Sequence, residues 1–235
     1  MRLIRQGRSL EAIPILDGLL QQDPLLNRAQ LERGRARMFC DDLEGAFADV
    51  DEVLQRCPEE TLGLEIRAQA HRKHGDRRAA EADYSTIIHI NPKDESAYIQ
   101  RGRLRLQTGE LEAAIADFTR AIELNSRPLS GLLNRGKARH LSGDLRGAAE
   151  DLGAAIELEI DPVFGPLHRG RVRLDLGDIQ GAVDDFTTAL QNDPQLTNAL
   201  RLRAHARRLL GQSNGATEDD RRYQELGGED LPAYR

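Results

Sequence analysis

Residues 95–128 read ESAYIQRGRLRLQTGELEAAIADFTRAIELNSRP, a 34-residue stretch whose pattern recurs along the chain. Its first half ends at Gly109, and an acidic residue, Glu110, opens the second half. Glycine suits the left-handed position that ends a helix, and an acidic residue favours the start of the next helix. The apolar residues of the second half have helical spacing: Leu111, Ala114, Ile115, Phe118, Ala121 and Ile122. The stretch therefore predicts two helices joined by a tight turn.

Four columns of residues keep the same 34-residue period over most of the chain. Prolines fall at 24, 58, 92 and 194, and turn glycines at 7, 75, 109, 143, 177 and 211, with Asp41 in the remaining turn. The eighth position of the repeat is small: Gly34, Ala68, Gly102, Gly136, Gly170 and Ala204. The twentieth position is alanine: Ala12, Ala46, Ala80, Ala114, Ala148, Ala182 and Ala216. One helix pair cannot bury its apolar stripe alone, so we expect neighbouring pairs to stack.

This pattern resembles that of the tetratricopeptide-repeat family over about residues 1–226. The resemblance implies an all-α fold, a right-handed α-solenoid of stacked antiparallel helix hairpins. We expect a single solenoid with four parts: a partial first repeat at 1–26, five full repeats at 27–196, a degenerate repeat with a C-terminal cap at 197–226, and a flexible tail at 227–235. Because Met1 falls in mid-repeat, we expect a fragment of a longer repeat protein, or a second chain covering the stripe of Ala12, Ile13, Leu16 and Leu20.

Two further columns have strictly opposite charge. The seventh position of the repeat is arginine: Arg33, Arg67, Arg101, Arg135, Arg169 and Arg203. The twenty-third position is aspartate: Asp49, Asp83, Asp117, Asp151, Asp185 and Asp219. Partly buried charge is tolerated when it is paired, and the arginine guanidinium suits bidentate pairing with a carboxylate. We therefore predict a structural ladder of Arg–Asp ion pairs along the stack.

The family resemblance implies that a different face of the first helix in each repeat lines a concave groove. Its ninth position is mostly basic: Arg35, Gln69, Arg103, Lys137, Arg171 and His205. Beside this row we expect exposed, mostly aliphatic side chains at the fifth and twelfth positions: Ile99, Leu133, Leu167, Leu106, His140 and Leu174. Ordered charge beside exposed apolar groups is typical of a peptide-binding surface. We predict that these residues bind an extended segment of another protein that is acidic or ends in a C-terminal carboxylate; a merely solvated face is the alternative.

Composition narrows the class of protein. The net charge of −6 argues against general binding to nucleic acid or to membrane surfaces. No apolar run approaches the roughly 20 residues that span a bilayer. The two cysteines, Cys40 and Cys57, are too few for a disulfide framework, and the N-terminus lacks a secretory signal. These features predict a cytoplasmic protein.

Patterns of catalytic or metal-binding residues are missing from the sequence. His71 and His74 have no evident third ligand for zinc. The glycines recur as helix ends and do not form a phosphate-binding loop. We therefore predict no metal, no cofactor and no enzymatic activity, but a non-catalytic scaffold or adaptor. Two alternatives stay open: an RNA-binding helical repeat whose basic row contacts phosphates, and a self-assembling structural module.

Overall fold

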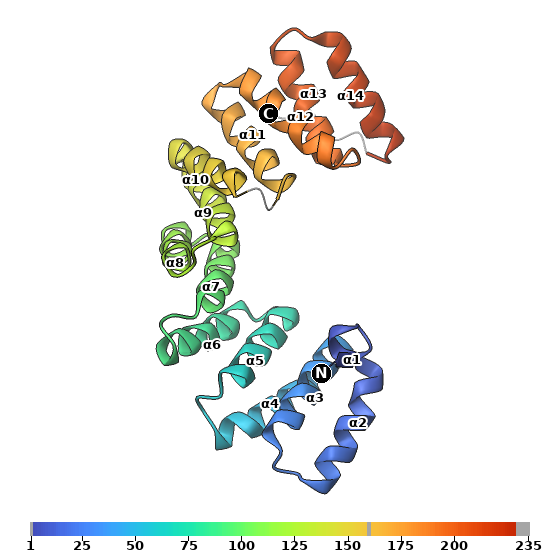
Figure 1. The fold of residues 1–235 in the computed structure, drawn as a ribbon, viewed down its shortest axis with the longest axis vertical. Helices are drawn as coiled ribbons and strands as arrows, with labels where there is room; N and C mark the ends of the chain where they lie inside the picture. Colours follow the sequence, from blue (N-terminus) through green and yellow to red (C-terminus); the bar gives the residue numbers. More distant parts are fainter. Residues whose placement is uncertain (1, 159–160, 229–235) are drawn as a thin grey trace. The chain divides into compact units, whose positions relative to one another are not determined.

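The computed structural model describes residues 2–158 and 161–228, and every regular element in these ranges is an α-helix. The helices are α1 (Arg2–Arg5), α2 (Ser9–Gln22), α3 (Asn27–Phe39), α4 (Leu43–Arg56), α5 (Thr61–His74), α6 (Arg77–Ile90), α7 (Glu95–Thr108), α8 (Leu111–Leu124), α9 (Leu129–Ser142), α10 (Leu145–Glu157), α11 (Phe164–Leu176), α12 (Ile179–Asn192), α13 (Thr197–Leu209) and α14 (Ser213–Glu225). They fall into two compact units, Met1–Leu104 and Arg105–Arg235. The boundary lies within α7 (Figure 1).

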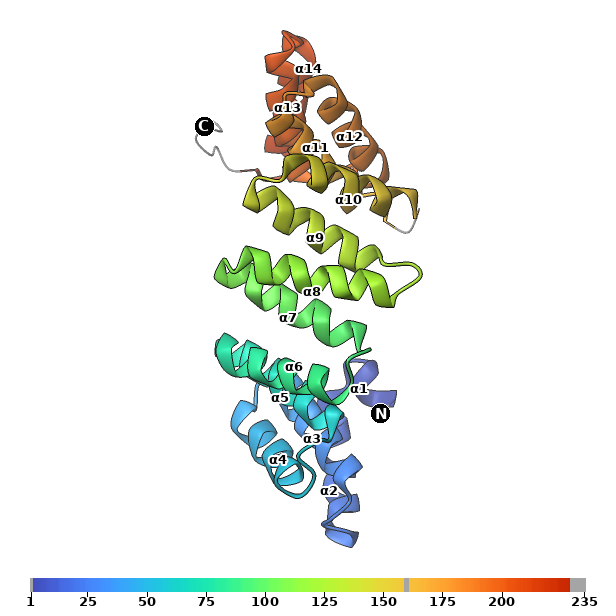
Figure 2. The same cartoon turned by 90° about the vertical axis from the view of Figure 1, so that its left-hand side faces the viewer.

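Within each unit, consecutive helices pack as antiparallel hairpins that stack in chain order (Figures 1 and 2). In the first unit α3 pairs with α4 and α5 with α6, and α4 packs on α5. In the second unit the hairpins are α9–α10, α11–α12 and α13–α14, and they are joined by the packing of α10 on α11 and of α12 on α13. The predicted all-α fold of stacked helix hairpins is confirmed.

The turns inside the hairpins have the conformation that the glycine column predicts. Gly143 adopts a φ of 88° and Gly177 a φ of 82°, which is the left-handed region that glycine enters without steric cost. Asp41, which replaces glycine in one turn, also has a positive φ, of 65°. Asp tolerates this region better than most side chains. The acid that follows the turn then caps the next helix, as Asp144 accepts a hydrogen bond from the Gly147 amide at 3.0 Å.

Small side chains let the two helices of a hairpin approach closely. A methyl group built at Gly136 would lie 2.8 Å from Leu152 Cγ, and one at Gly170 would lie 2.6 Å from Phe186 Cε1. Ala148 and Ala182, at the twentieth position, are completely buried. The close helix contact therefore depends on the small residues at both positions, as the repeat pattern predicted.

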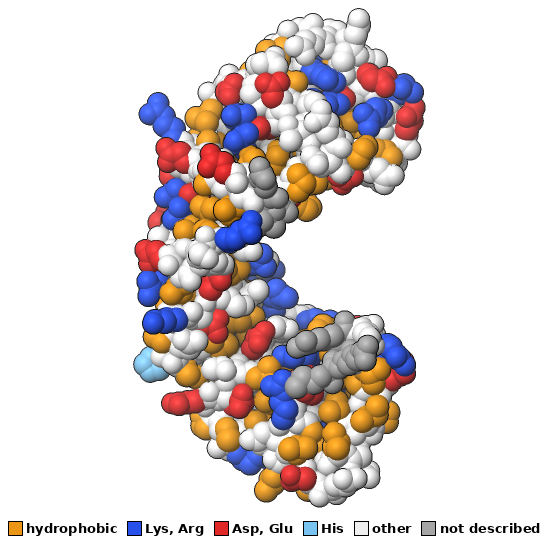
Figure 3. All heavy atoms as spheres, in the orientation of Figure 1, with side chains coloured by type: hydrophobic (Ala, Val, Ile, Leu, Met, Phe, Trp, Pro, Cys, Tyr) orange, Lys and Arg blue, Asp and Glu red, His pale blue; other side chains and the backbone are white. Residues whose placement is uncertain are grey.

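The apolar stripe of α2 is covered by its own chain. Ala12, Leu16 and Leu20 are buried in one cluster with Ile4 of α1 and with Ala29 and Ala36 of α3. The first unit nevertheless exposes several large hydrophobic side chains on and beside α2. They are Leu10, Ile15, Leu19, Leu25 and Leu26. Figure 3 shows hydrophobic side chains gathered over the part of this unit where α2, α3 and α4 lie.

The last helix, α14, buries little besides Ala216 and Asp219. Its outer surface is charged: Arg221 forms ion pairs of 2.7 Å with both Glu218 and Glu225, and Asp220 pairs with Arg208 of α13. The C-terminal cap expected over these residues stays a prediction. Most of the flexible tail predicted for 227–235 lies outside the described residues, and the single solenoid over the whole chain stays a prediction.

Candidate functional site

The Arg and Asp columns meet within each hairpin. Arg135 of α9 donates from Nε and Nη2 to both carboxylate oxygens of Asp151 on α10, at 2.9 and 2.7 Å. Four further pairs have the same bidentate geometry: Arg33–Asp49, Arg67–Asp83, Arg169–Asp185 and Arg203–Asp219. The five aspartates are buried, whereas the arginines other than Arg203 are half-buried. Arg101 belongs to the first unit and Asp117 to the second, so that this pair stays a prediction.

A second arginine, one helical turn further along the first helix, reinforces most of these carboxylates. Arg139 Nη1 lies 3.0 Å from Asp151 Oδ2 and also donates to the Gly147 carbonyl at 3.3 Å. The same position supplies a pair to Asp49, Asp117, Asp185 and Asp219 from Arg37, Arg105, Arg173 and Arg207. Repeat two differs because His71 holds this position and packs against Phe47, with ring centroids 4.7 Å apart and ring planes tilted by 42°.

The arginines at the seventh repeat position, such as Arg67 and Arg135, also bind the preceding hairpin. The sequence pattern did not predict these contacts. Arg67 Nη1 contacts Asp51 Oδ1 at 2.8 Å, and Arg135 Nη1 donates to Thr119 Oγ1 at 3.1 Å. Each partner lies 16 residues before its arginine, as the aspartate lies 16 residues after it. This position holds Asp17, Asp51, Ser85, Thr119 and Thr187, and in one hairpin Gly153, which has no side chain to accept the bond. The sequence could have indicated these contacts, because all but one of these positions carry a side chain with an oxygen acceptor. Each such arginine joins three helices, which fixes the spacing of consecutive hairpins.

In the first unit, two of the three residues of the predicted basic row contact acids of their own helices. Arg35 lies 3.6 Å from the buried carboxylate of Glu32, and Gln69 donates to Glu65 Oε1 at 3.0 Å. Arg103 of α7 is exposed. The row therefore offers one exposed cation in this unit, Arg103, whereas Arg35 is held by an acid of its own helix.

The aliphatic residues predicted beside the row differ in exposure. Ile99 and Leu167 are only 5% and 4% exposed, so the expectation that they are exposed is wrong. Both side chains turn toward the core, where Leu167 joins the cluster around Phe186. Leu133 and Leu174 are half-buried and pack on core clusters, and Leu106 is also half-buried. The outer part of this surface is thus less apolar than predicted.

In the second unit, basic groups of successive first helices converge. Lys137 of α9 and Arg171 of α11 are half-buried, and their positive charges both act on His168. Burial, followed by these two charges, lowers the pKa of His168 to about 4. His140 also acts on His168, and its Nε2 lies 2.5 Å from Asp175 Oδ2. We call Lys137, His140, His168 and Arg171 the basic cluster. His205, also predicted for this row, is half-buried on α13.

A known repeat family matches the middle of the chain. The sequence profile described as tetratricopeptide repeat matches residues 67–127 and 99–163, and these ranges contain the alternating helices of the fold described above. Residues 67–163 of this chain are tetratricopeptide repeats. No curated protein has a significantly similar sequence.

Several solved structures have a fold similar to that of this chain. A tetratricopeptide repeat protein from Parabacteroides merdae is 19% identical with a TM-score of 0.73, over 97% of this chain and 91% of its own. PilW, a type IV pilus biogenesis factor, is 18% identical with a TM-score of 0.74, over 85% and 93%. A chain of the APC/C hetero-tetramer Cut9–Hcn1 is 15% identical with a TM-score of 0.73, over 97% and 45%. At these identities the likeness shows the fold alone.

A metal site needs several ligating side chains grouped together, and a membrane span needs a long apolar helix. In residues 2–158 and 161–228, no three His, Cys, Asp or Glu side chains are grouped to hold a metal ion. None of the helices in these ranges combines the length and apolar character needed to cross a bilayer. The cytoplasmic location stays a prediction.

Proposed function

We propose that this chain is a non-catalytic protein-binding scaffold or adaptor whose basic cluster holds an extended acidic segment of another protein. The observation that carries the proposal is that Lys137 and Arg171, one repeat apart, both act electrostatically on the half-buried His168. Because His168 has a pKa of about 4, it is neutral at physiological pH. It therefore adds no charge of its own beside the two permanent cations.

Charge-assisted contacts favour a carboxylate ligand at this place. Lysine and arginine both donate to carboxylates, and such hydrogen bonds are about twice as strong as neutral ones. An extended segment crossing α9 and α11 would meet Lys137 and then Arg171, with the half-buried Leu133 and Leu174 nearby for its apolar side chains. Arg103 is an exposed cation in the ninth-position row of the first unit. Arg35 and Gln69 are not part of the proposed surface because acids of their own helices already engage them.

Fluorescence polarisation with a labelled 12-residue peptide of alternating Glu and Leu tests the proposal. The double variant Lys137→Glu and Arg171→Glu should weaken binding by at least tenfold, because two charge-assisted contacts become repulsive. A matched variant, Arg78→Glu with Arg146→Glu, makes the same change of charge at exposed positions of the second helices α6 and α10 and should bind as wild type does. Amidating the C-terminus of the peptide separates an internal acidic segment from a terminal carboxylate.

Equal affinity of the two double variants would refute the proposal, because a general effect of net charge would then explain the binding. A peptide in which Lys replaces Glu should not bind. If single-stranded RNA instead bound the wild type in competition with the acidic peptide, the RNA alternative would replace this proposal. Circular dichroism of both variants, with helix content equal to wild type, completes the comparison.

A further inference from the structure

The first unit contains a buried hydroxyl group that its own chain leaves unsatisfied. Tyr84 on α6 is 2% exposed, and its hydroxyl oxygen has no hydrogen-bond partner in the described part of the chain. Buried polar groups in native proteins are nearly always paired, and an unpaired one is unfavourable. Desolvation raises the pKa of Tyr84 to about 12, so the hydroxyl stays protonated at neutral pH and can both donate and accept. This hydroxyl therefore has a hydrogen-bonding capacity that the described part of the chain leaves unused.

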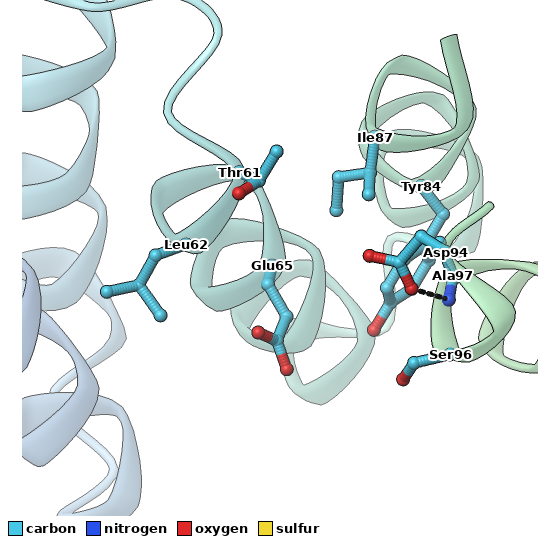
Figure 4. Close-up of a pocket in the computed structure, with 8 residues that line it drawn as sticks. All are labelled: Thr61, Leu62, Glu65, Tyr84, Ile87, Asp94, Ser96 and Ala97. Atoms are coloured by element: carbon cyan, nitrogen blue, oxygen red, sulfur yellow. Dashed lines mark hydrogen bonds between the residues drawn. The ribbon is translucent and has the colours of Figure 1, made fainter. Parts of the chain in front are cut away.

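Tyr84 lines a pocket of about 240 Å³ between α5, α6 and α7. Figure 4 shows the side chain of Tyr84 extending from α6, with its hydroxyl lying in this view between the carboxylate of Glu65 on α5 and the hydroxyl of Ser96 on α7. The apolar part of the lining comes from Leu62, Ile87 and Ala97. Pockets for drug-sized ligands measure about 300–1,000 Å³. The Tyr84 pocket is smaller and suits one amino-acid side chain.

The charges around the Tyr84 pocket are mainly negative. Glu65 accepts one hydrogen bond, from Gln69 Nε2 at 3.0 Å, and a carboxylate can accept several more. Asp94 also lines the pocket and caps α7 by accepting a bond from the Ala97 amide at 3.0 Å. The positive charge of the exposed Arg72 lowers the pKa of Tyr84, but less than burial raises it. Two carboxylates against one exposed arginine favour a cationic ligand and disfavour an anionic one.

We infer that the Tyr84 pocket binds the side chain of a lysine or arginine that belongs to a bound protein segment. The aliphatic stem would contact Leu62 and Ile87, while the cationic group donates to Glu65 and to the Tyr84 oxygen. The long stems of lysine and arginine pack on apolar surface while their charged ends keep polar partners. This inference rests on the proposed function only in that the ligand is a protein segment, because it uses none of the residues of the basic cluster.

An NMR titration of the full isotope-labelled chain tests the pocket with single-residue probes. The probes are Nα-acetyl-lysine methylamide and Nα-acetyl-arginine methylamide, and the norleucine analogue is the neutral control. Saturable shifts at Glu65, Tyr84 and Ala97 are expected with at least one cationic probe. Glu65→Gln should weaken that binding about tenfold or more, because the contact loses its charge.

Tyr84→Phe removes only the hydroxyl. It should weaken the cationic probe several-fold yet leave thermal stability unchanged or higher, because the hydroxyl has no partner in the described part of the free chain. Tyr98→Phe on α7 is the matched control, since Tyr98 is not part of the lining, and it should bind as wild type does. Absence of saturable shifts with both cationic probes, equal binding of the norleucine analogue, or unchanged affinity in Glu65→Gln would overturn the inference. Binding of the acidic peptide to Glu65→Gln is expected to be unchanged, so either proposal can fail while the other stands.

Discussion

Arg67→Ala is expected to destabilise the first unit more than the same change at Arg135 destabilises the second. Asp83 is buried, with a side chain only 7% exposed, and Arg67 is the one Lys or Arg among the described residues at ion-pair distance from it. Hydrogen bonding to Asp83 raises the pKa of Arg67. Breaking a buried pair costs about 3–5 kcal/mol because the remaining charge is unpaired. Since the Arg67 side chain is 28% exposed, water screens part of this loss, and we expect about 3 kcal/mol.

The comparison with Arg135 isolates the unpaired carboxylate. In Arg135→Ala, Asp151 still has Arg139 at 3.0 Å, so we expect a loss of only about 1–2 kcal/mol. The lost contact of Arg67 with Asp51, whose side chain is 44% exposed, adds at most about 1 kcal/mol. Replacing both partners of the buried pair, as Arg67→Met with Asp83→Leu, should restore most of the stability, because no buried charge is then left alone.

Hydrogen exchange measured by mass spectrometry gives the local free energy of opening for each hairpin, and urea unfolding followed by circular dichroism gives the total. Protection should fall mainly in α5 and α6 for Arg67→Ala and in α9 and α10 for Arg135→Ala. Equal losses in the two variants, or a double variant as unstable as Arg67→Ala, would refute the idea that these pairs serve chiefly to neutralise buried carboxylates.

Two further predictions concern packing and pH. Gly170→Ala should lower the free energy of unfolding by about 1–3 kcal/mol, because its methyl group would lie 2.6 Å from the Phe186 ring. Gly153→Ala on α10 has no neighbouring atom closer than 3.8 Å and should raise the free energy of unfolding by about 0.5–1 kcal/mol. The midpoints of urea unfolding compare the two variants. His168 has a pKa of about 4 when folded against 6.5 when unfolded, so the unfolded chain binds more protons between these values. Its contribution to stability is complete above about pH 6.5 and is lost as the pH falls toward 4. His168→Asn, chosen because Asn134 holds the same repeat position, should remove that part of the pH dependence, and an unchanged pH profile of the melting temperature would contradict this explanation.

Much of the fold followed from residues whose physical role is local. Gly143 and Gly177 end helices because glycine enters the left-handed region freely, and Asp144 caps the next helix through its own side chain. Such effects act over a few residues and therefore appear directly in the sequence. The period of the repeat then predicted the stacking, because each hairpin leaves an apolar stripe that only a neighbour can cover.

The candidate site was harder to predict because it depends on how each helix is rotated about its axis. Ile99 and Leu133 occupy the same repeat position, yet Ile99 is buried and Leu133 is half-buried. Arg35 and Arg103 also share a position, but Arg35 is half-buried and lies 3.6 Å from Glu32, whereas Arg103 is exposed. Whether a groove cation is compensated thus depends on the neighbouring side chains, which a single column of residues does not specify.

The sequence by itself determined the helix hairpins, their turns and the Arg–Asp partners within five of the hairpins, since a fixed period places these residues at fixed offsets. Only the tertiary structure decided that Arg67 and Arg135 also bind the preceding hairpin, that Lys137 and Arg171 converge on His168, and that Tyr84 has an unsatisfied hydroxyl beside Glu65. These features arise where side chains from different repeats meet, and their distances depend on how closely the helices pack.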